Sequence, residues 1–168
     1  MTGLANAVFN KHDVLLVILD NGTTAMTGHQ PNPGVCTSVL GEGCNHLDIE
    51  SVVRGIGVTD VAKVKPFNMR GTLKTIEEMK ARFGVRVIIA EEPCMLFARR
   101  TLKQNRPQVA EVATQGEEAL KCLAELACPA FRRGGTAEAP VVSVDESQCS
   151  GCMVCLQVTP AIRARKRS

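Results

Sequence analysis

Three cysteines near the end of the chain have the residue type and the spacing of a metal site. Cys149, Cys152 and Cys155 are each separated by two residues in the run SQCSGCMVC. Thiolates at this spacing on a tight loop bind one corner of an iron–sulfur cube, and the fourth ligand comes from elsewhere in the chain. Zinc is the competing metal, but a triplet followed by Pro160 fits an iron–sulfur site better than paired zinc knuckles. The spacing therefore favours a [4Fe–4S] cluster over zinc or unligated thiols.

A second group of polar residues follows an apolar run. Residues 14–19 are all apolar, which is the pattern of a strand buried on both faces of a parallel sheet. Open α/β sheets bind ligands at the carboxyl ends of their strands, and Asn, Thr and main-chain oxygens suit Mg²⁺ with a bound diphosphate. Glycines let the backbone come close to phosphate oxygens. The residues predicted to form this cofactor site are Asp20, Asn21, Gly22, Thr23, Thr24, Thr27, Gly28, His29 and Gln30.

The same stretch resembles a known family. LDNGTTAMTGHQPNPG is similar to the thiamine-diphosphate segment of the 2-oxoacid:ferredoxin oxidoreductases, and among them to the alpha subunits of indolepyruvate ferredoxin oxidoreductases. The resemblance continues through NAVFNKHD, VIIAEEPC and the cysteine motifs, so it covers nearly the whole chain. It implies thiamine diphosphate and Mg²⁺, with the Asn21 side chain and the Thr23 carbonyl as metal ligands. The Gly-Asp pair that begins the family's motif, and supplies its other metal ligand, would lie upstream of Met1.

The resemblance also implies how the cysteines are shared between clusters. In two-cluster ferredoxins the fourth cysteine of each run ligates the other cluster. The first run here keeps Cys122 and Cys128, with Gly116 and Ala119 at its first two cysteine positions, and the second run has Thr159 at its last. Counted crosswise, one set of ligands is complete: Cys128, Cys149, Cys152 and Cys155. We therefore expect one cluster with Cys122 left free. The alternative is random decay of an unused segment.

Length and composition limit the class of protein. With 168 residues and 45% hydrophobic residues, the chain is long enough for a packed core. It has no bilayer-length apolar run and no signal-peptide pattern at its start, which predicts a cytoplasmic protein. In that reducing compartment disulfides are rare, and Cys36, Cys44 and Cys94 are expected to be small buried residues. The net charge of +3 owes much to residues 163–167, expected to be a solvated tail, so nucleic-acid binding is not predicted.

The order of the elements predicts the fold class. Helical patterns over residues 4–9, 47–54 and 73–83, the last capped by Gly84, alternate with strand patterns over 14–19, 58–64 and 85–90. This alternation predicts an α/β fold with a parallel sheet. Residues 1–112 are interpreted as the C-terminal part of a thiamine-diphosphate-binding domain. Residues 113–168 are interpreted as a small ferredoxin-like iron–sulfur domain, with a turn over residues 132–138.

The resemblance implies a reaction and its partners. The family decarboxylates a 2-oxo acid oxidatively, here an aryl pyruvate such as indolepyruvate, transfers the acyl group to CoA and passes electrons through iron–sulfur clusters to ferredoxin. A glutamate on another domain activates the cofactor in that family. A second oxidoreductase subunit, or the preceding part of the polypeptide, is therefore an implied partner, and the chain alone is not expected to turn over. Two alternatives remain: a non-catalytic fragment acting as an iron–sulfur electron-transfer or interaction module, and a thiamine-dependent 2-oxoacid decarboxylase.

Overall fold

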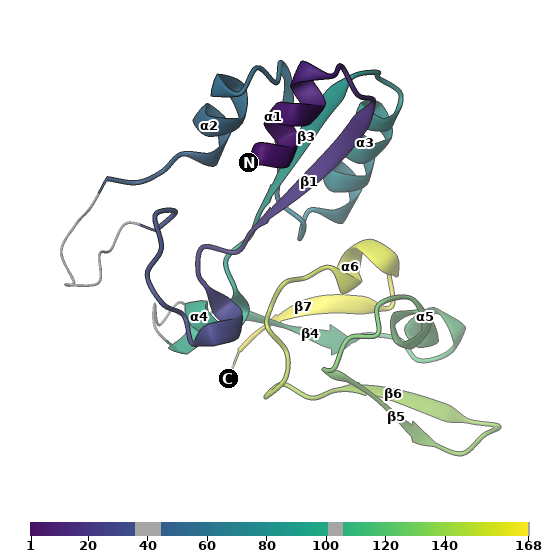
Figure 1. The fold of residues 1–168 in the computed structure, drawn as a ribbon. Helices are drawn as coiled ribbons and strands as arrows, with labels where there is room; N and C mark the ends of the chain where they lie inside the picture. The colour runs from purple at the N-terminus through teal and green to yellow at the C-terminus, as the bar shows by residue number, and fades with distance from the viewer. Residues whose placement is uncertain (36–44, 101–105, 168) are drawn as a thin grey trace. The chain divides into compact units, whose positions relative to one another are not determined.

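The computed structural model describes residues 1–35, 45–100 and 106–167 and divides the chain into two compact units, Met1–Lys103 and Gln104–Ser168 (Figure 1). The second unit thus begins earlier than the expected residue 113, because the strand over residues 108–112 pairs with the last strand of the chain. Cys36 and Cys44, expected to be small buried residues, lie outside the described residues. None of the described helices has both the length and the hydrophobicity that crossing a bilayer requires.

The first unit is built on a three-stranded sheet. Its strands are β1 (Val14–Asp20), β2 (Asp60–Val64) and β3 (Val85–Glu91), all parallel in the order β1-β3-β2. The helices are α1 (Thr2–Phe9), α2 (Ile49–Gly55), α3 (Met69–Lys80) and α4 (Met95–Arg100), and the short 3₁₀ helix η1 (Ala25–Thr27) follows β1. The predicted parallel α/β sheet is confirmed.

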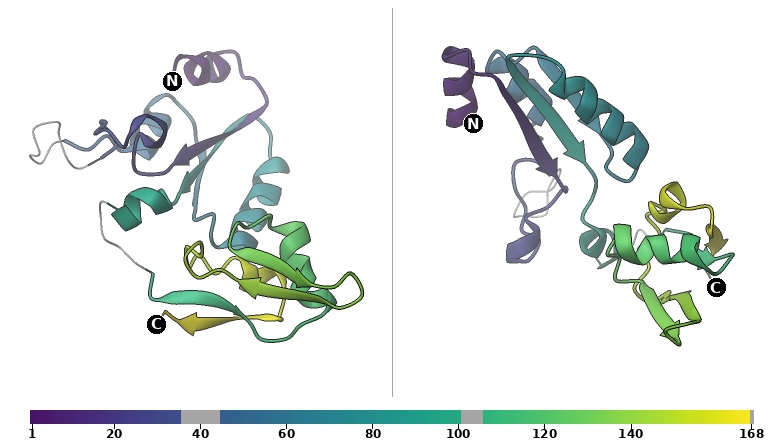
Figure 2. Two further views of the ribbon diagram at one scale, coloured as in Figure 1. Left: turned by 90° about the horizontal axis from the view of Figure 1, so that it is seen from below. Right: turned by 90° about the vertical axis from the view of Figure 1, so that its right-hand side faces the viewer.

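Helices cover both faces of this sheet. On one face Val87 and Ile89 of β3 pack with Leu4 of α1 and Val53 of α2, and on the other face Ile88 and Ala90 pack with Val64 and Met79. Figure 2 (right) shows α1 and α3 on opposite sides of the paired strands β1 and β3. The apolar run of β3 therefore belongs to a central strand that is buried on both faces, as such runs indicate.

The expectation that β1 is also buried on both faces is wrong. Leu19 is 79% exposed and Val17 is 45% exposed. The cause is position in the sheet, since β1 pairs with β3 on one side and with no other strand among the described residues. An apolar run shows that a strand is suited to burial, but it does not show which polypeptide covers it.

Two helices begin at residues other than those predicted, because side-chain caps set where they start. The side-chain oxygen of Asn68 accepts a hydrogen bond from the backbone N–H of Gly71 (3.3 Å), so α3 begins before the predicted residue 73. It ends at Lys80, and Gly84, expected as its C-cap, instead adopts a φ of 92° just before β3. Asp48 caps α2 by accepting from the N–H of Ser51 at 3.0 Å.

The second unit contains two pairs of antiparallel strands. Its elements are β4 (Gln108–Val112), α5 (Glu117–Glu125), β5 (Phe131–Gly135), β6 (Pro140–Val144), α6 (Cys155–Val158) and β7 (Ile162–Lys166). Strand β4 pairs with β7, and β5 pairs with β6. Along the chain, the order strand, helix, strand occurs twice. Two expectations are corrected: the turn over residues 132–138 includes most of β5, and the basic tail over 163–167 is largely β7.

An ion pair between the buried Arg86 and the exposed Asp13 lies at the amino ends of β1 and β3. The side chain of Arg86 is 6% exposed, and its Nη2 atom lies 2.5 Å from Oδ1 of Asp13. The same Asp13 oxygen accepts from the N–H of Gly84 (3.1 Å), and Nη1 of Arg86 donates to the carbonyl of Met79 (3.3 Å). This pair joins the segment before β1 to β3 and to α3.

We predict that Asp13→Ala lowers the free energy of unfolding by about 2 kcal/mol, because it leaves the buried Arg86 charge without its anion. Arg82→Met is the matched control, since the pair between Arg82 and Asp60 has 52% and 36% exposed side chains. That control should cost about 0.5 kcal/mol. Urea unfolding followed by far-UV circular dichroism measures both variants, and equal losses would contradict the assignment of Arg86–Asp13 as a structural link.

Candidate functional sites

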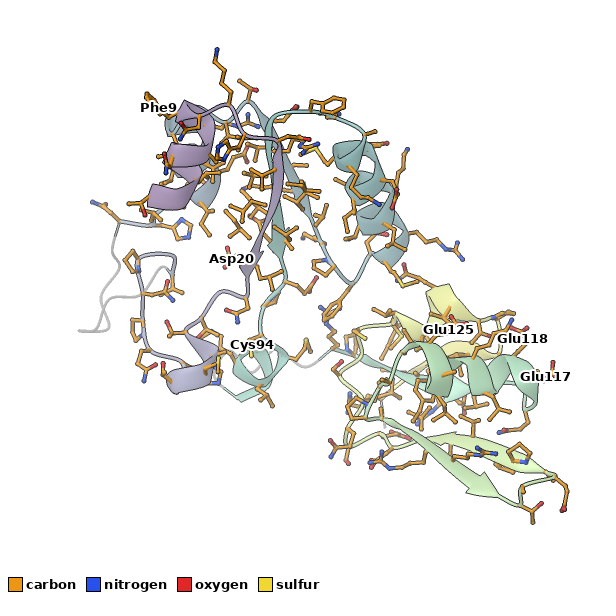
Figure 3. The ribbon with its side chains drawn as sticks, turned by 45° about the vertical axis from the view of Figure 1, so that its right-hand side comes forward. Phe9, Asp20, Cys94, Glu117, Glu118 and Glu125 are labelled. Carbon is orange, nitrogen blue, oxygen red and sulfur yellow. The ribbon has the colours of Figure 1, made fainter. Side chains whose placement is uncertain are left out.

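The polar residues after β1 form a tightly folded loop. Oδ1 of Asp20 accepts from the N–H of Gly22 (3.0 Å), and Oδ1 of Asn21 accepts from the N–H of Thr23 (3.2 Å). These two successive Asx turns bend the chain sharply as it leaves the strand. Figure 3 shows Asp20 at this end of β1. The predicted site residues are therefore collected at the carboxyl edge of the sheet.

Main-chain hydrogen bonds fasten this loop to the segment that follows β3. The N–H of Glu92 donates to the carbonyl of Asp20 (3.0 Å), and the N–H of Cys94 donates to the carbonyl of Asn21 (2.9 Å). The Asn21 side chain is exposed, so it remains available to a ligand. Cys94, expected to be buried, is half-buried just before α4 (Figure 3).

The second half of the loop closes on itself. Thr24 and Gln30 form an isolated antiparallel bridge. The hydroxyl of Thr27 donates to Oε1 of Gln30 (2.6 Å), and Nε2 of Gln30 donates to the Thr27 carbonyl. Between them Gly28 has a φ of 105°, which a residue with a side chain adopts only with strain. In this geometry Thr27 and Gln30 fix the shape of the loop.

His29 has a strained backbone and two side-chain contacts. Its φ is 64°, uncommon for a residue other than glycine, and such strain is concentrated at functional sites. Nδ1 lies 3.3 Å from the Thr23 hydroxyl, and the imidazole ring lies 5.3 Å from the ring of Phe97, centroid to centroid. Nε2 has no hydrogen-bond partner among the described residues. No sequence pattern indicated Phe97, which lies in α4 and contacts the loop through His29.

Charged residues join α2 to the same edge of the sheet. Nζ of Lys63 in β2 lies 3.1 Å from Glu91 at the end of β3 and 3.4 Å from Glu50 in the first turn of α2. The hydrogen bond to Glu91 is the largest cause of a raised pKa for Lys63, although burial opposes it. Through these two ion pairs Lys63 links β2 to the first turn of α2 and to the end of β3. Sequence analysis did not identify it.

In the second unit the four cysteines predicted as one ligand set line a single cavity. Its volume is about 160 Å³ and its other walls are largely apolar, with Leu126, Phe131 and Met153 among them. The four cysteines are Cys128, Cys149, Cys152 and Cys155. Cys149 and Cys155 are buried, Cys128 and Cys152 are half-buried, and the N–H of Ala110 in β4 points to Sγ of Cys149 at 3.5 Å. The four thiols thus share one apolar cavity.

The backbone around these cysteines is held in unusual conformations. Ala127, next to Cys128, has a φ of 44°, and Met153, next to Cys152, has a φ of 60°. Gly151 has a φ of 72°, and a Cβ atom there would lie 2.6 Å from the carbonyl oxygen of Gln108. Glycine is therefore required where the cysteine loop packs on β4. Strain of this kind persists only when the surrounding structure imposes it.

Three of the four positions of the incomplete ligand set are buried, and the fourth, Gly116, is exposed. Ala119 and Cys122 are fully buried, and Thr159 is 2% exposed. The hydroxyl of Thr159 donates to Glu118 of α5 (3.0 Å) and accepts from the N–H of Ala161 (3.2 Å). Figure 3 shows Glu118 on α5. Within the described ranges, no three His, Cys, Asp or Glu side chains converge closely enough to hold a metal ion as they stand.

Comparison with known proteins gives a family match over most of the first unit. Residues 1–90 match the family model described as thiamine pyrophosphate enzyme, C-terminal TPP binding domain. No solved structure gives a significant match.

Curated relatives are named indolepyruvate oxidoreductase subunit IorA. The protein from Archaeoglobus fulgidus is 39% identical over 94% of this chain and 25% of its own length, and that from Methanothermobacter thermautotrophicus is 41% identical over 94% and 24%. The protein from Thermococcus kodakarensis is 36% identical over 95% and 25%. These names confirm the resemblance seen in the sequence, and the chain spans about a quarter of the length of these relatives.

The buried thiols give a prediction about reactivity. Burial raises the pKa of Cys122 from 9.0 to about 11 and that of Cys155 to about 12. At pH 8 the thiolate fraction of Cys122 is then about a hundredfold lower than in the unfolded chain, and it rises as pH approaches 11. In the iron-free chain, iodoacetamide should modify Cys122 and Cys155 far more slowly than the half-buried Cys94. Mass spectrometry measures the rates, and comparable rates for Cys122 and Cys94 in the folded chain would contradict the burial.

Proposed function

The chain belongs to the thiamine pyrophosphate enzyme family through its C-terminal TPP-binding domain, and we propose that it is the cofactor-binding part of a 2-oxoacid:ferredoxin oxidoreductase. The observation that carries this proposal is the folded loop from Asp20 to Gln30 at the carboxyl edge of a parallel sheet. The printed names of the relatives favour indolepyruvate, an aryl pyruvate, as the 2-oxo acid. CoA as acyl acceptor and ferredoxin as electron acceptor follow from the family resemblance.

The loop has donor atoms of the type that Mg²⁺ and a diphosphate need. Asn21 and Thr23 offer oxygen ligands, and Gly22, with open space where a Cβ would stand, lets the backbone approach a phosphate. When bound, thiamine diphosphate supplies the carbon nucleophile and electron sink for decarboxylation of a 2-oxo acid. In this proposal Asn21 and Thr23 hold the metal that binds the diphosphate, and the Asx turns keep both residues at the strand end.

His29 is assigned to an anionic group of cofactor or substrate. Its Nδ1 lies within hydrogen-bond distance of the Thr23 hydroxyl (3.3 Å), and its ring packs against Phe97, so the imidazole is oriented from two sides. Nε2 is then the ring nitrogen that binds a phosphate oxygen or a substrate carboxylate. The strained φ of 64° at this residue supports a functional role.

The cysteine cavity is proposed as the electron exit. Cys128, Cys149, Cys152 and Cys155 supply one thiolate for each iron of a [4Fe–4S] cluster, and the apolar walls limit solvent access. Such a cluster supplies one-electron transfer. The N–H of Ala110, directed at Sγ of Cys149, stabilises negative charge on that sulfur. This cavity favours the oxidoreductase over a thiamine-dependent decarboxylase, which has no need of a cluster.

The cofactor assignment predicts that Asn21→Ala weakens binding of thiamine diphosphate in the presence of Mg²⁺ by about tenfold or more, which corresponds to about 1.4 kcal/mol. The physical reason is the loss of one oxygen ligand from the metal. Asn10→Ala is the matched control, because Asn10 bonds only to Asn6 at the end of α1 among the described residues. Isothermal titration calorimetry measures both. We expect the wild-type chain itself to bind weakly, because Asn21 and Thr23 add no charge to neutralise the metal. Unchanged affinity in Asn21→Ala would reject the loop as the cofactor site.

The cluster assignment predicts about four irons per chain after anaerobic reconstitution, and not about eight. Cys128→Ser should lower the iron content and the visible absorbance of the cluster, since serine is a poor substitute for a thiolate. Cys122→Ser should retain both, because Cys122 does not line the cavity. Zinc in place of iron, or a cluster that requires Cys122 and tolerates Cys128→Ser, would refute the assignment.

A further inference from the structure

Arg167 lies directly after β7 and contacts the segment that carries the first cysteine of the triplet. Its own N–H donates to the carbonyl of Pro107 (2.8 Å), which extends the pairing of β7 with β4 beyond Lys166 (Figure 1). From this fixed position, Nη2 of the side chain donates to the carbonyl of Cys149 (2.8 Å), and Nη1 donates to that of Glu146 (3.3 Å). One guanidinium therefore ties two main-chain carbonyls of this segment to the paired strands β4 and β7.

The charge of this guanidinium is not neutralised by a carboxylate. Arg165, two residues earlier, forms an ion pair with Glu146, whereas Arg167 forms none within the residues that the structure describes. Its Nε atom is also buried, with no hydrogen-bond partner in the described part of the chain. A buried donor of this kind is unfavourable unless negative charge lies nearby. Arg167 thus places unpaired positive charge beside Cys149.

The segment of Cys128 is held in a similar way, but with a different charge. There Nη1 of Arg132 donates to the carbonyl of Pro129, the residue after Cys128. Nη2 of the same side chain lies 3.2 Å from Oδ2 of Asp145, so this guanidinium has an anion as its partner. The two ends of the proposed ligand set are thus both tied down by arginine, and among the described residues only Arg167 does so without a carboxylate partner.

We propose that Arg167 is a positioning residue of the iron–sulfur site and that its charge raises the reduction potential of the cluster. Cys149 is one of the four proposed ligands, so the guanidinium that binds its carbonyl lies within one residue of a ligand sulfur. Reduction adds an electron to the cluster, and a half-buried cation nearby stabilises the more negative state. The effect on the potential rests on the proposed cluster, whereas the support of the segment does not.

A redox titration of the reconstituted full chain, followed by electron paramagnetic resonance, tests the effect of the charge. Arg167→Gln removes the charge but keeps a side-chain donor, and it should lower the equilibrium constant for reduction about tenfold, or about 59 mV for one electron. Arg167→Lys keeps the charge and should stay close to the wild-type potential. Arg163→Gln is the matched control, because it removes the same charge from β7 at a side chain that is 66% exposed, and it should leave the potential unchanged.

Hydrogen exchange of the iron-free chain tests the support of the segment without a cluster. The amides of residues 149–153 should exchange faster in Arg167→Gln than in the wild type, because one side-chain donor cannot bind both carbonyls. Arg167→Lys should show part of this increase, since an ammonium group lacks the planar fork of a guanidinium. Arg163→Gln should show none.

Equal potentials in the wild type and Arg167→Gln would overturn the effect of the charge, and equal exchange rates would overturn the support of the segment. A potential that falls as far in Arg167→Lys as in Arg167→Gln would show that shape and not charge sets it, which also overturns the proposal. A wild-type chain that takes up no iron would refute the proposed cluster and with it the effect on the potential. Faster exchange in Arg167→Gln would then still assign the support of the segment to Arg167.

Discussion

The pairing of β1 with β3 is the interaction on which the candidate cofactor site depends. The two strands are parallel and in register from Val14 opposite Val85 to Asp20 opposite Glu91. Both strands therefore end at the same edge of the sheet. The carbonyls of Asp20 and Asn21 can then accept hydrogen bonds from the segment after β3. That segment leads to α4 and to Phe97, which packs on His29. Loss of this register would separate the loop from its supports.

In the second unit, the loop that carries Cys149 and Cys152 must also be held in one shape. The described residues of this cysteine loop form no helix or strand before α6. The shape of the loop comes from close packing on β4 at Gly151 and from strained backbone at Met153. Arg167 adds a further support, since Nη2 donates to the carbonyl of Cys149 at 2.8 Å. The basic end of the chain thus holds the thiol loop in place.

Much of the fold followed from local pattern. The apolar runs at residues 14–19 and 85–90 gave the two strands, and the helical periodicity gave three helices within a few residues. Helix α3 starts earlier than predicted, because the Asn68 cap lies before the first apolar residue of the helical pattern. Strand β4 was missed as part of the second unit, because its pairing with β7 joins residues far apart in sequence. Long-range pairing of that kind leaves little trace in a local pattern.

The sequence by itself determined the chemistry that the chain can offer. The spacing of Cys149, Cys152 and Cys155, and the oxygen ligands that follow residue 19, are properties of residue type and order. Only the tertiary structure decided which of these groups meet. It brought Cys128 to the triplet, buried Thr159, placed Phe97 against His29 and left Leu19 of β1 exposed. The reason is physical: residue type fixes what a side chain can bind, whereas packing between distant segments fixes what lies within its reach.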